Sequence, residues 1–447
     1  MQFWADCCVL GRGTERNLDE AERWYRKACS LGNNEAAFQL GKLCEYYRKD
    51  SAEAVKWLRK AADWGHAGAM CRLAGYYYLG KGGLEQDEIK AMQFLRAAAD
   101  AGDAEAMCEL GRRFALGNGV ARNMEKAGEW YRRAEDADSL TALVRLGEAC
   151  LENIWIGKTT KDAAQYFERA LELGDERGAG GLGFCYLMGE GVPKDEVKGV
   201  ELLRRGVKVE YNWAMCWLAN YYFLKGDKTK YKEAGELLRK AAENGNSEAM
   251  AMLGSYYAAE GEEQNLDEAE RWLTRAVELG NARGTLTLGL FYWNEGKCDQ
   301  ETAEKAMRLM RDAVDMGAIL ATISLGACYE AGVGGKPDYD EAERWYRKGL
   351  EVGLAESAFR LGFLLVGQGA KGAKDERKVQ EGLAMLQKAA EWGDPRGWIA
   401  LGYYWANGIG GKKDLRKAKE FYRKAEASGV PEAEEKARAA LKALAEK

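Results

Sequence analysis

The chain reads NLDEAERWYRKA at residues 17–28, and this stretch decides the fold because it returns almost unchanged further along. It recurs as NLDEAERWLTRA at residues 265–276 and as YDEAERWYRKG at residues 339–349. Acidic residues at the start of each copy and basic residues at its end complement the dipole of an α-helix. Each copy is therefore predicted to be helical, and the recurrence indicates an internal repeat.

A short motif at the end of each predicted helix B gives the length of this repeat. It is usually Ala or Gly, three further residues and Gly, and its last positions lie 33 to 40 residues apart. Chance does not produce such regularity along a whole chain, so we predict about twelve units. The units end at Gly32, Gly65, Gly102, Asp138, Gly174, Glu210, Gly245, Gly280, Gly317, Gly353, Gly393 and Gly429.

Each unit also holds an earlier helical segment, here called helix A, while the stretch quoted first is helix B. Helix A is marked by Leu followed by Gly or Ala, as at Leu40-Gly41 and Leu253-Gly254. A glycine inside a helix costs about 1 kcal/mol, so its repetition implies that another helix's backbone approaches closely there. The residue four positions after the Leu shares its helix face and is predicted to point into the core. These residues are Tyr77, Phe114, Tyr186, Tyr222, Tyr257, Tyr292, Tyr329 and Trp405.

Together with glycine turns such as Gly117-Asn118-Gly119, these motifs resemble the Sel-one-like repeat (SLR) family, relatives of the tetratricopeptide repeat, over essentially the whole chain. The resemblance implies an all-α, right-handed α-solenoid of antiparallel helix pairs that acts as an adaptor in protein complexes. We expect repeats over residues 1–430 and a C-terminal capping helix over 431–447, beginning at Pro431. Residue 1 falls inside a helix A, which fits either a longer protein or a trimmed first repeat.

Three departures from the family pattern predict locally distorted turns. Unit four ends in Asp138, unit six has Gly206 and Glu210 where Ala and Gly are usual, and unit eleven is extended around residues 368–372.

Composition narrows the function classes. The net charge is −5, from 66 basic and 71 acidic residues, so no strong attraction for nucleic acid is expected. No apolar stretch approaches the length of a membrane span, and the first residues lack the pattern of a secretory signal. The 11 cysteines sit mostly one per repeat, which favours reduced thiols. We therefore expect a cytoplasmic, monomeric solenoid.

Catalytic motifs are absent from the sequence. The single histidine, His66, has no recognisable partner motif and is interpreted as structural. There is no C-x-x-C pair for zinc, and the glycine-rich stretches at 332–336 and 408–412 do not complete a phosphate-binding loop. We expect no catalytic residue, no metal and no cofactor, and hence a protein that is not an enzyme.

The candidate binding residues lie on helix A. Counted from its Leu, positions −1 and +2 point away from the core stripe and are predicted to face the concave groove, with +3 on the flank. Early units hold Lys42, Arg72, Arg112 and Arg145 there, and later units hold Phe184, Trp217, Met252, Leu290, Phe363 and Tyr403. Position +3 adds Tyr76, Tyr221, Tyr256, Phe291 and Tyr404. These side chains form either a partner groove, basic first and aromatic from the sixth unit, or packing between neighbouring A helices.

Three hypotheses for function follow. The first is a scaffold or adaptor that binds a protein or peptide segment along the groove. The second is an inhibitor or immunity-type protein that wraps and blocks one enzyme, which the sequence does not separate from the first. The third is a glycan or cell-wall binder, which stacked, solvent-facing aromatic rings would favour.

Overall fold

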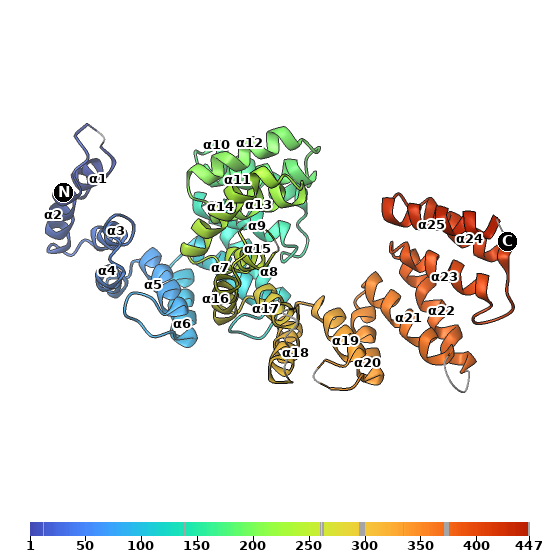
Figure 1. The fold of residues 1–447 in the computed structure, drawn as a ribbon. Coiled ribbons are helices and arrows are strands. Elements are labelled where there is room, and N and C mark those ends of the chain that lie inside the picture. Colours follow the sequence, from blue (N-terminus) through green and yellow to red (C-terminus); the bar gives the residue numbers. More distant parts are fainter. Residues whose placement is uncertain are drawn as a thin grey trace. The chain divides into compact units, whose positions relative to one another are not determined.

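A computed structural model describes residues 1–447 except 12, 138, 260, 262, 295–299, 334, 371–374 and 446–447. The described residues form helices without any strand (Figure 1), which confirms the all-helical solenoid prediction. They divide into two compact units, residues 1–244 and 245–447. The insertion predicted at residues 368–372 falls partly, and Asp138 wholly, outside the described residues.

The helices follow one another in pairs, each A helix packing most closely on the B helix after it. In residues 1–244 they are α1 (Gln2–Leu10), α2 (Leu18–Cys29), α3 (Asn34–Leu43), α4 (Ser51–Asp63), α5 (Ala67–Leu79), α6 (Glu88–Asp100), α7 (Ala104–Leu116), α8 (Met124–Asp136), α9 (Leu140–Leu151), α10 (Thr160–Glu172), α11 (Arg177–Met188), α12 (Glu196–Lys208), α13 (Asn212–Leu224) and α14 (Tyr231–Glu243). A short π-helix, η1 (Cys44–Arg48), extends α3, and a 3₁₀ turn, η2 (Lys228–Lys230), precedes α14.

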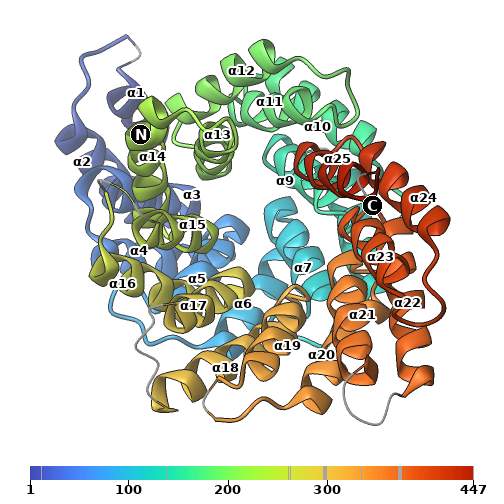
Figure 2. The same cartoon turned by 45° about the vertical axis from the view of Figure 1, so that its right-hand side comes forward.

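Residues 245–447 continue the same pattern. Their helices are α15 (Ser247–Ala258), α16 (Leu266–Glu278), α17 (Ala282–Asn294), α18 (Gln300–Asp315), α19 (Ala321–Ala331), α20 (Tyr339–Glu351), α21 (Ala355–Ala370), α22 (Glu376–Glu391), α23 (Arg396–Asn407), α24 (Leu415–Glu426) and α25 (Pro431–Ala445). Figure 2 shows the A helices α19, α21 and α23 along one side of this unit and the B helices α20, α22 and α24 along the other.

The last helix packs as the sequence predicts. α25 begins at Pro431, buries Ala433 and Ala437, and contacts α24 and α23. Its small apolar stripe therefore covers the end of the preceding pair.

Most B helices begin at a residue whose polar side chain caps them, α14 being an exception. The side chain of Asn17 accepts a hydrogen bond from the Glu20 amide at 3.0 Å, and Asp338 accepts one from Glu341 at 3.0 Å. Such a cap stabilises a helix by about 1 kcal/mol. The repeated motif thus specifies the helix start as well as its buried face.

The residue that closes each B helix recurs once per repeat and, among the described residues, has a left-handed backbone conformation. Gly174 has φ +92° and Gly393 has φ +98°, and the other closing glycines are also left-handed. This conformation favours glycine, because a Cβ is strained there. Glu210 adopts it too, with φ +58°. The turn predicted to be distorted at unit six therefore keeps the usual backbone path and carries strain instead.

Glu210→Gly is accordingly expected to raise the free energy of unfolding by about 0.5 kcal/mol. Glycine relieves about 1–2 kcal/mol of left-handed backbone strain. This gain exceeds two costs, the larger backbone entropy that glycine loses on folding and the loss of the exposed Glu210–Lys240 ion pair at 2.9 Å. Urea unfolding measures the change. The reverse substitution, Gly174→Glu, places a side chain in open space at a left-handed φ and should destabilise; equal midpoints for both variants would refute the argument.

Most glycines of helix A make room for a side chain of the partner B helix. A Cβ built on Gly111 would lie 2.8 Å from the ring of Tyr131, and one on Gly402 would lie 2.6 Å from the ring of Tyr422. At Gly183 and Gly362 the nearest atoms include backbone of the facing helix, at 2.7 and 2.8 Å. The expectation of close backbone approach therefore holds at these two positions, whereas elsewhere a ring or aliphatic side chain fills the space.

Leucine at two of these glycines should destabilise unequally. A Cβ at Gly254 would lie 2.5 Å from Leu273, while one at Gly289 would lie 3.0 Å from the flexible side chain of Met310. We expect Gly254→Leu to cost about 3 kcal/mol and Gly289→Leu about 1 kcal/mol, because methionine repacks more easily. Denaturation midpoints equal to wild type for Gly254→Leu would show that this packing is not tight.

The stripe four residues after the Leu is only partly core. Tyr222, Tyr257 and Tyr292 are buried, whereas Tyr77 and Tyr186 are only partly buried. Several of these tyrosine hydroxyls instead accept hydrogen bonds from cationic side chains of B helices. Examples are Arg59 to Tyr77 at 3.0 Å, Lys198 to Tyr186 at 2.7 Å and Arg311 to Tyr329 at 2.7 Å. These amphipathic tyrosines therefore lie at the boundary between the core and the surface.

Most described cysteines are buried among apolar side chains, and none of the ten forms a disulfide with another. Burial raises the pKa of Cys185 and Cys150 to about 12 and that of Cys44 to about 11. These thiols therefore stay protonated, and unreactive, at neutral pH.

Ellman's reagent is expected to modify these three thiols only after unfolding, while the partly exposed Cys7 reacts in the folded protein. The same shifts predict alkaline destabilisation. An unfolded thiol ionises near pH 9 but the folded one near pH 12, so the contribution to stability is complete below pH 9 and is lost as the pH rises towards 12. Rapid modification of Cys185 in the folded protein would contradict this.

Candidate partner-binding surfaces

Three of the four basic side chains predicted on the early A helices are paired with carboxylates. Arg72 contacts Glu45 at 2.8 Å, and Arg112 contacts Glu152 at 3.2 Å. Lys42 lies over the ring of Phe38, 5.5 Å from its centre. The predicted basic groove is therefore corrected to a surface in which Arg72 and Arg112 are neutralised locally.

Arg145 belongs to a network that joins three A helices. It contacts Glu148 of α9 at 3.0 Å and Glu105 of α7 at 3.6 Å. The Tyr211 hydroxyl, at the start of α13, donates to Glu148 across a sequence separation of 63 residues. Burial and the Glu148 charge raise the pKa of Tyr211 well above its usual value, so the hydroxyl remains a donor.

An aromatic cluster lies beside this network in residues 1–244, and we name it the Trp217 cluster. It consists of Phe184, Tyr211, Trp213 and Trp217. The ring centre of Phe184 lies 4.3 Å from that of Trp217 and 5.1 Å from that of Trp213. Both tryptophans are partly exposed and cover Phe184, which is 9 % exposed. The sequence interpretation missed Trp213, although its spacing of four residues from Trp217 places both on one helix face.

Five candidate residues are buried and take the alternative role of packing between helices. They are Tyr76, Phe184, Met252, Phe291 and Tyr404. Neighbouring helices cover both flanks of each A helix, which explains why position +3 is often inside. These five are therefore not themselves exposed, and Phe184 and Tyr404 support neighbouring rings that are exposed or partly exposed.

Two aromatic side chains in residues 245–447 are exposed at the same repeat position. Phe363 of α21 is 52 % exposed and Tyr403 of α23 is 55 % exposed, each two residues after the helix-A Leu. With Phe359 and Tyr404 they form a run of rings whose successive centres are 6.2, 6.4 and 5.7 Å apart. We name these four residues the Phe363 patch.

The remaining candidates, Leu290, Tyr221 and Tyr256, are partly buried. Leu290 packs against the core formed by α18 and α19, and Tyr221 borders α12.

The single histidine has a structural position. The Nδ1 atom of His66 accepts from the Ala69 amide at 3.1 Å and so caps α5. Its Nε2 atom lies 2.8 Å from Glu35, and its ring stacks on Phe38 at 4.3 Å. Both ring nitrogens are therefore occupied, Nδ1 by the cap of α5 and Nε2 by Glu35 of α3, the A helix of the preceding repeat.

Comparison with known families accounts for this repetition of helix pairs. The Sel1 repeat model matches residues 1–33, 34–66, 67–103, 104–139, 141–175, 179–208, 214–246, 247–281, 319–354, 355–394 and 399–430. The chain belongs to the Sel1 repeat family. Sel1 repeat proteins generally mediate protein–protein interactions and are generally non-catalytic. The pair α17–α18 lies between matched repeats and continues their architecture.

Solved structures similar to this Sel1 repeat protein include three of different origin. A protective antigen of uropathogenic Escherichia coli with an SLR fold, c5321, is 25 % identical over 95 % of this chain and 94 % of its own, with a TM-score of 0.48. The immunity protein Pa5087 of Pseudomonas aeruginosa is 20 % identical over 48 % and 81 %, with a TM-score of 0.36. Yeast Tom70 is 15 % identical over 98 % and 94 %, with a TM-score of 0.45.

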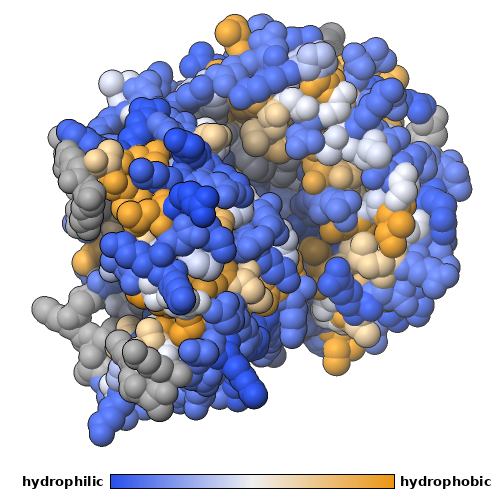
Figure 3. All heavy atoms as spheres, turned by 90° about the vertical axis from the view of Figure 1, so that its right-hand side faces the viewer, coloured by the Kyte–Doolittle hydropathy of each residue, from blue (hydrophilic) through white to orange (hydrophobic). Residues whose placement is uncertain are grey.

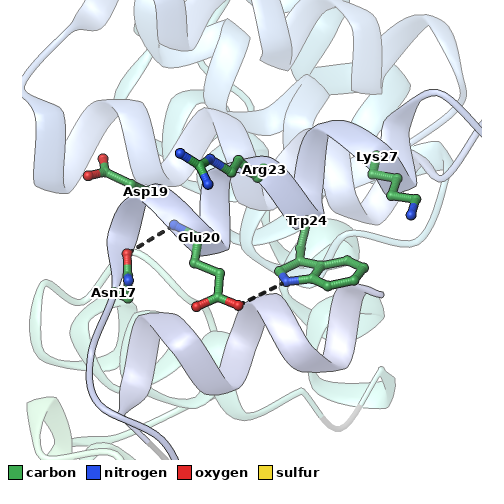
Figure 4. A pocket seen from close by; sticks show the side chains of 6 residues that line it. All are labelled: Asn17, Asp19, Glu20, Arg23, Trp24 and Lys27. Atoms are coloured by element: carbon green, nitrogen blue, oxygen red, sulfur yellow. Dashed lines mark hydrogen bonds between the residues drawn. The ribbon is translucent and has the colours of Figure 1, made fainter.

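The face shown in Figure 3 is mainly hydrophilic, with separate apolar patches. The outer side of α2 illustrates the polar part (Figure 4). There Asn17 caps the helix, and Glu20 accepts a hydrogen bond from the Trp24 indole at 3.4 Å. Within the described ranges, no helix is long and apolar enough to cross a membrane, and no group of three metal-ligating side chains gathers.

Proposed function

We propose that this Sel1 repeat protein is a non-enzymatic scaffold that binds a protein or peptide segment on its A-helix face, with the Phe363 patch as an anchor point. The observation that carries the proposal is the exposure of Phe363 and Tyr403, 52 % and 55 %, at one repeat position on neighbouring A helices. Adjacent exposed rings are costly in water and are enriched among residues that dominate binding energy.

The Trp217 cluster supports a second contact point in residues 1–244. Trp213 and Trp217 are partly exposed, and Tyr211 of the same cluster donates to Glu148. Glu148 pairs with Arg145, whose side chain is the more exposed of the two. Because carboxylates already neutralise Arg112 and Arg145, a partner there needs polar hydrogen-bonding groups more than a large negative charge.

The ring geometry favours a protein partner over a glycan. A sugar stacks best on a flat aromatic face, whereas Phe363 and Tyr404 are inclined by 44° and Tyr403 and Tyr404 by 68°. Side chains of a peptide fit between inclined rings in edge-to-face contact.

Photo-crosslinking in the source organism tests this proposal. The photoreactive amino acid p-benzoylphenylalanine replaces Phe363 and, as a matched control, the exposed Leu266 at the start of a B helix. We expect a defined protein to be linked from position 363 and not from position 266, and mass spectrometry identifies it. No specific protein adduct at 363, or linkage to a polysaccharide, would refute the scaffold function on this face.

A further inference from the structure

A third surface lies on α12. It shares no residue with the Phe363 patch or the Trp217 cluster, and of the earlier candidates it includes only Tyr221. The outer side of α12 and Tyr221 of α13 line an open groove of about 1010 Å³. Its apolar part consists of Val197, Val200 and Tyr221. Val197 is 82 % exposed.

The three copies of the repeated motif carry acids where α12 has these valines, whereas α6 has the exposed Ile89 at the position of Val197. Counting from the N-cap, Val197 and Val200 of α12 correspond to Asp19 and Glu22 of α2. The two other copies of the repeated motif likewise carry acids there, namely Asp267 and Glu270 in α16 and Asp340 and Glu343 in α20. Acidic side chains suit the first turns of a helix, so the valines forgo a favourable interaction with the helix dipole. Neither helix formation nor core packing requires the exposed Val197.

The charges around the groove are predominantly positive. Glu196 is bridged by Lys225 at 2.7 Å and Lys194 at 3.1 Å, which cancels its charge. Arg204 donates to the neutral hydroxyl of Tyr222 at 3.1 Å, so that contact leaves its charge in place.

The other three charged side chains of the lining are Glu201, Arg205 and Lys208. Arg205 is paired with Glu176 at 2.8 Å. The lining residues and their ion-pair partners together carry five positive and three negative charges. The cations are Lys194, Arg204, Arg205, Lys208 and Lys225, and the carboxylates are Glu176, Glu196 and Glu201.

We propose that this groove binds a peptide segment of a partner protein that places one large apolar side chain on Val197, Val200 and Tyr221 and a carboxylate beside Arg204 and Lys208. Seven residues of helix separate Val197 from Arg204, or about 10 Å, which sets the spacing of the two groups in the partner. Apolar contact supplies the affinity, while the cations orient the segment. The site is separate from the Phe363 patch and goes beyond the scaffold function proposed above.

Selection from a displayed library of random twelve-residue peptides tests the proposal on the full chain. Bound peptides are counter-selected against the double variant Val197→Asp, Val200→Glu, which installs the residues of α2. This variant should fold normally, because the same residues occupy these positions in three sibling helices. We expect an enriched pattern of one large apolar residue with one or two acids at the stated spacing.

Synthetic peptides of that pattern should bind the double variant at least tenfold more weakly than wild type in fluorescence anisotropy. Arg204→Gln with Lys208→Gln should weaken binding and reduce its dependence on salt. The control variant Phe363→Ala, Tyr403→Ala should bind these peptides normally, which separates this site from the proposed scaffold surface.

Three outcomes would overturn the proposal. In the first, no peptide is enriched on the wild type relative to the double variant. In the second, the enriched peptides share a pattern without acidic residues. In the third, the wild type sediments as a dimer and the double variant does not. The last would assign the groove to a second copy of this chain.

Discussion

Phe167→Ala is expected to lower the free energy of unfolding by about 3–5 kcal/mol, more than any other substitution proposed for this protein. Phe167 of α10 is fully buried between two A helices. A Cβ on Gly147 of α9 would lie 2.6 Å from its ring, and Gly181 of α11 packs against the same ring. Glycines have no side chain with which to refill the space, so the cavity would persist.

Urea unfolding followed by tryptophan fluorescence measures this loss, and hydrogen exchange locates it in α9, α10 and α11. Phe363→Ala serves as the matched control, because that ring is half-exposed and its removal should change stability by less than about 0.5 kcal/mol. Equal midpoints for the two variants would show that glycine–ring packing does not hold these repeats together.

The double variant Phe363→Ala, Tyr403→Ala is expected to weaken binding of the crosslinked partner at least 30-fold, about 2 kcal/mol, without a change in the unfolding midpoint. Both rings are exposed, so their loss removes contact area rather than core. Tyr404→Ala is the complementary control, because Tyr404 is buried and its loss should lower stability. Undiminished affinity in the folded double variant would remove the Phe363 patch from the binding site.

The repeat architecture could be predicted from the sequence because it depends on local chemistry. Caps such as Asn17 and the left-handed φ of closing glycines act within a few residues, so spacing alone reveals them. Even Glu210 keeps the left-handed turn, since its neighbours impose the path that the sequence there disfavours.

Exposure of the candidate residues could not be predicted from one helix at a time. Phe184 and Phe363 occupy the same position, two after the Leu, yet one is buried and the other half-exposed. The difference lies in the next A helix. Trp217 precedes its Leu and covers Phe184, whereas the small Ala400 stands at that position beside Phe363. A prediction that compared the residue at position +2 of one repeat with the residue at position −1 of the next would have distinguished the buried Phe184 from the exposed Phe363.

The same dependence on the next helix explains why the pairing of the basic residues with carboxylates was not predicted. Arg112 and Arg145 hold these paired positions in neighbouring repeats. Glu148, which contacts Arg145, also lies at position +2, but Glu152 and Glu105 lie outside positions −1, +2 and +3 of helix A. The groove lined by Val197 was not predicted, because candidate positions were counted on helix A alone and α12 is a B helix.

The hydrogen bond from Tyr211 to Glu148 has a consequence for how stability spreads along the chain. It joins the fifth and seventh repeats directly, passing α11, where a Cβ on Gly180 would lie 2.8 Å from the Tyr211 ring. In a solenoid, each repeat ordinarily couples only to its immediate neighbours. Here the sixth repeat cannot open without releasing a bond between the repeats on either side of it. Repeats five to seven should therefore melt and exchange amide hydrogens as one cooperative block.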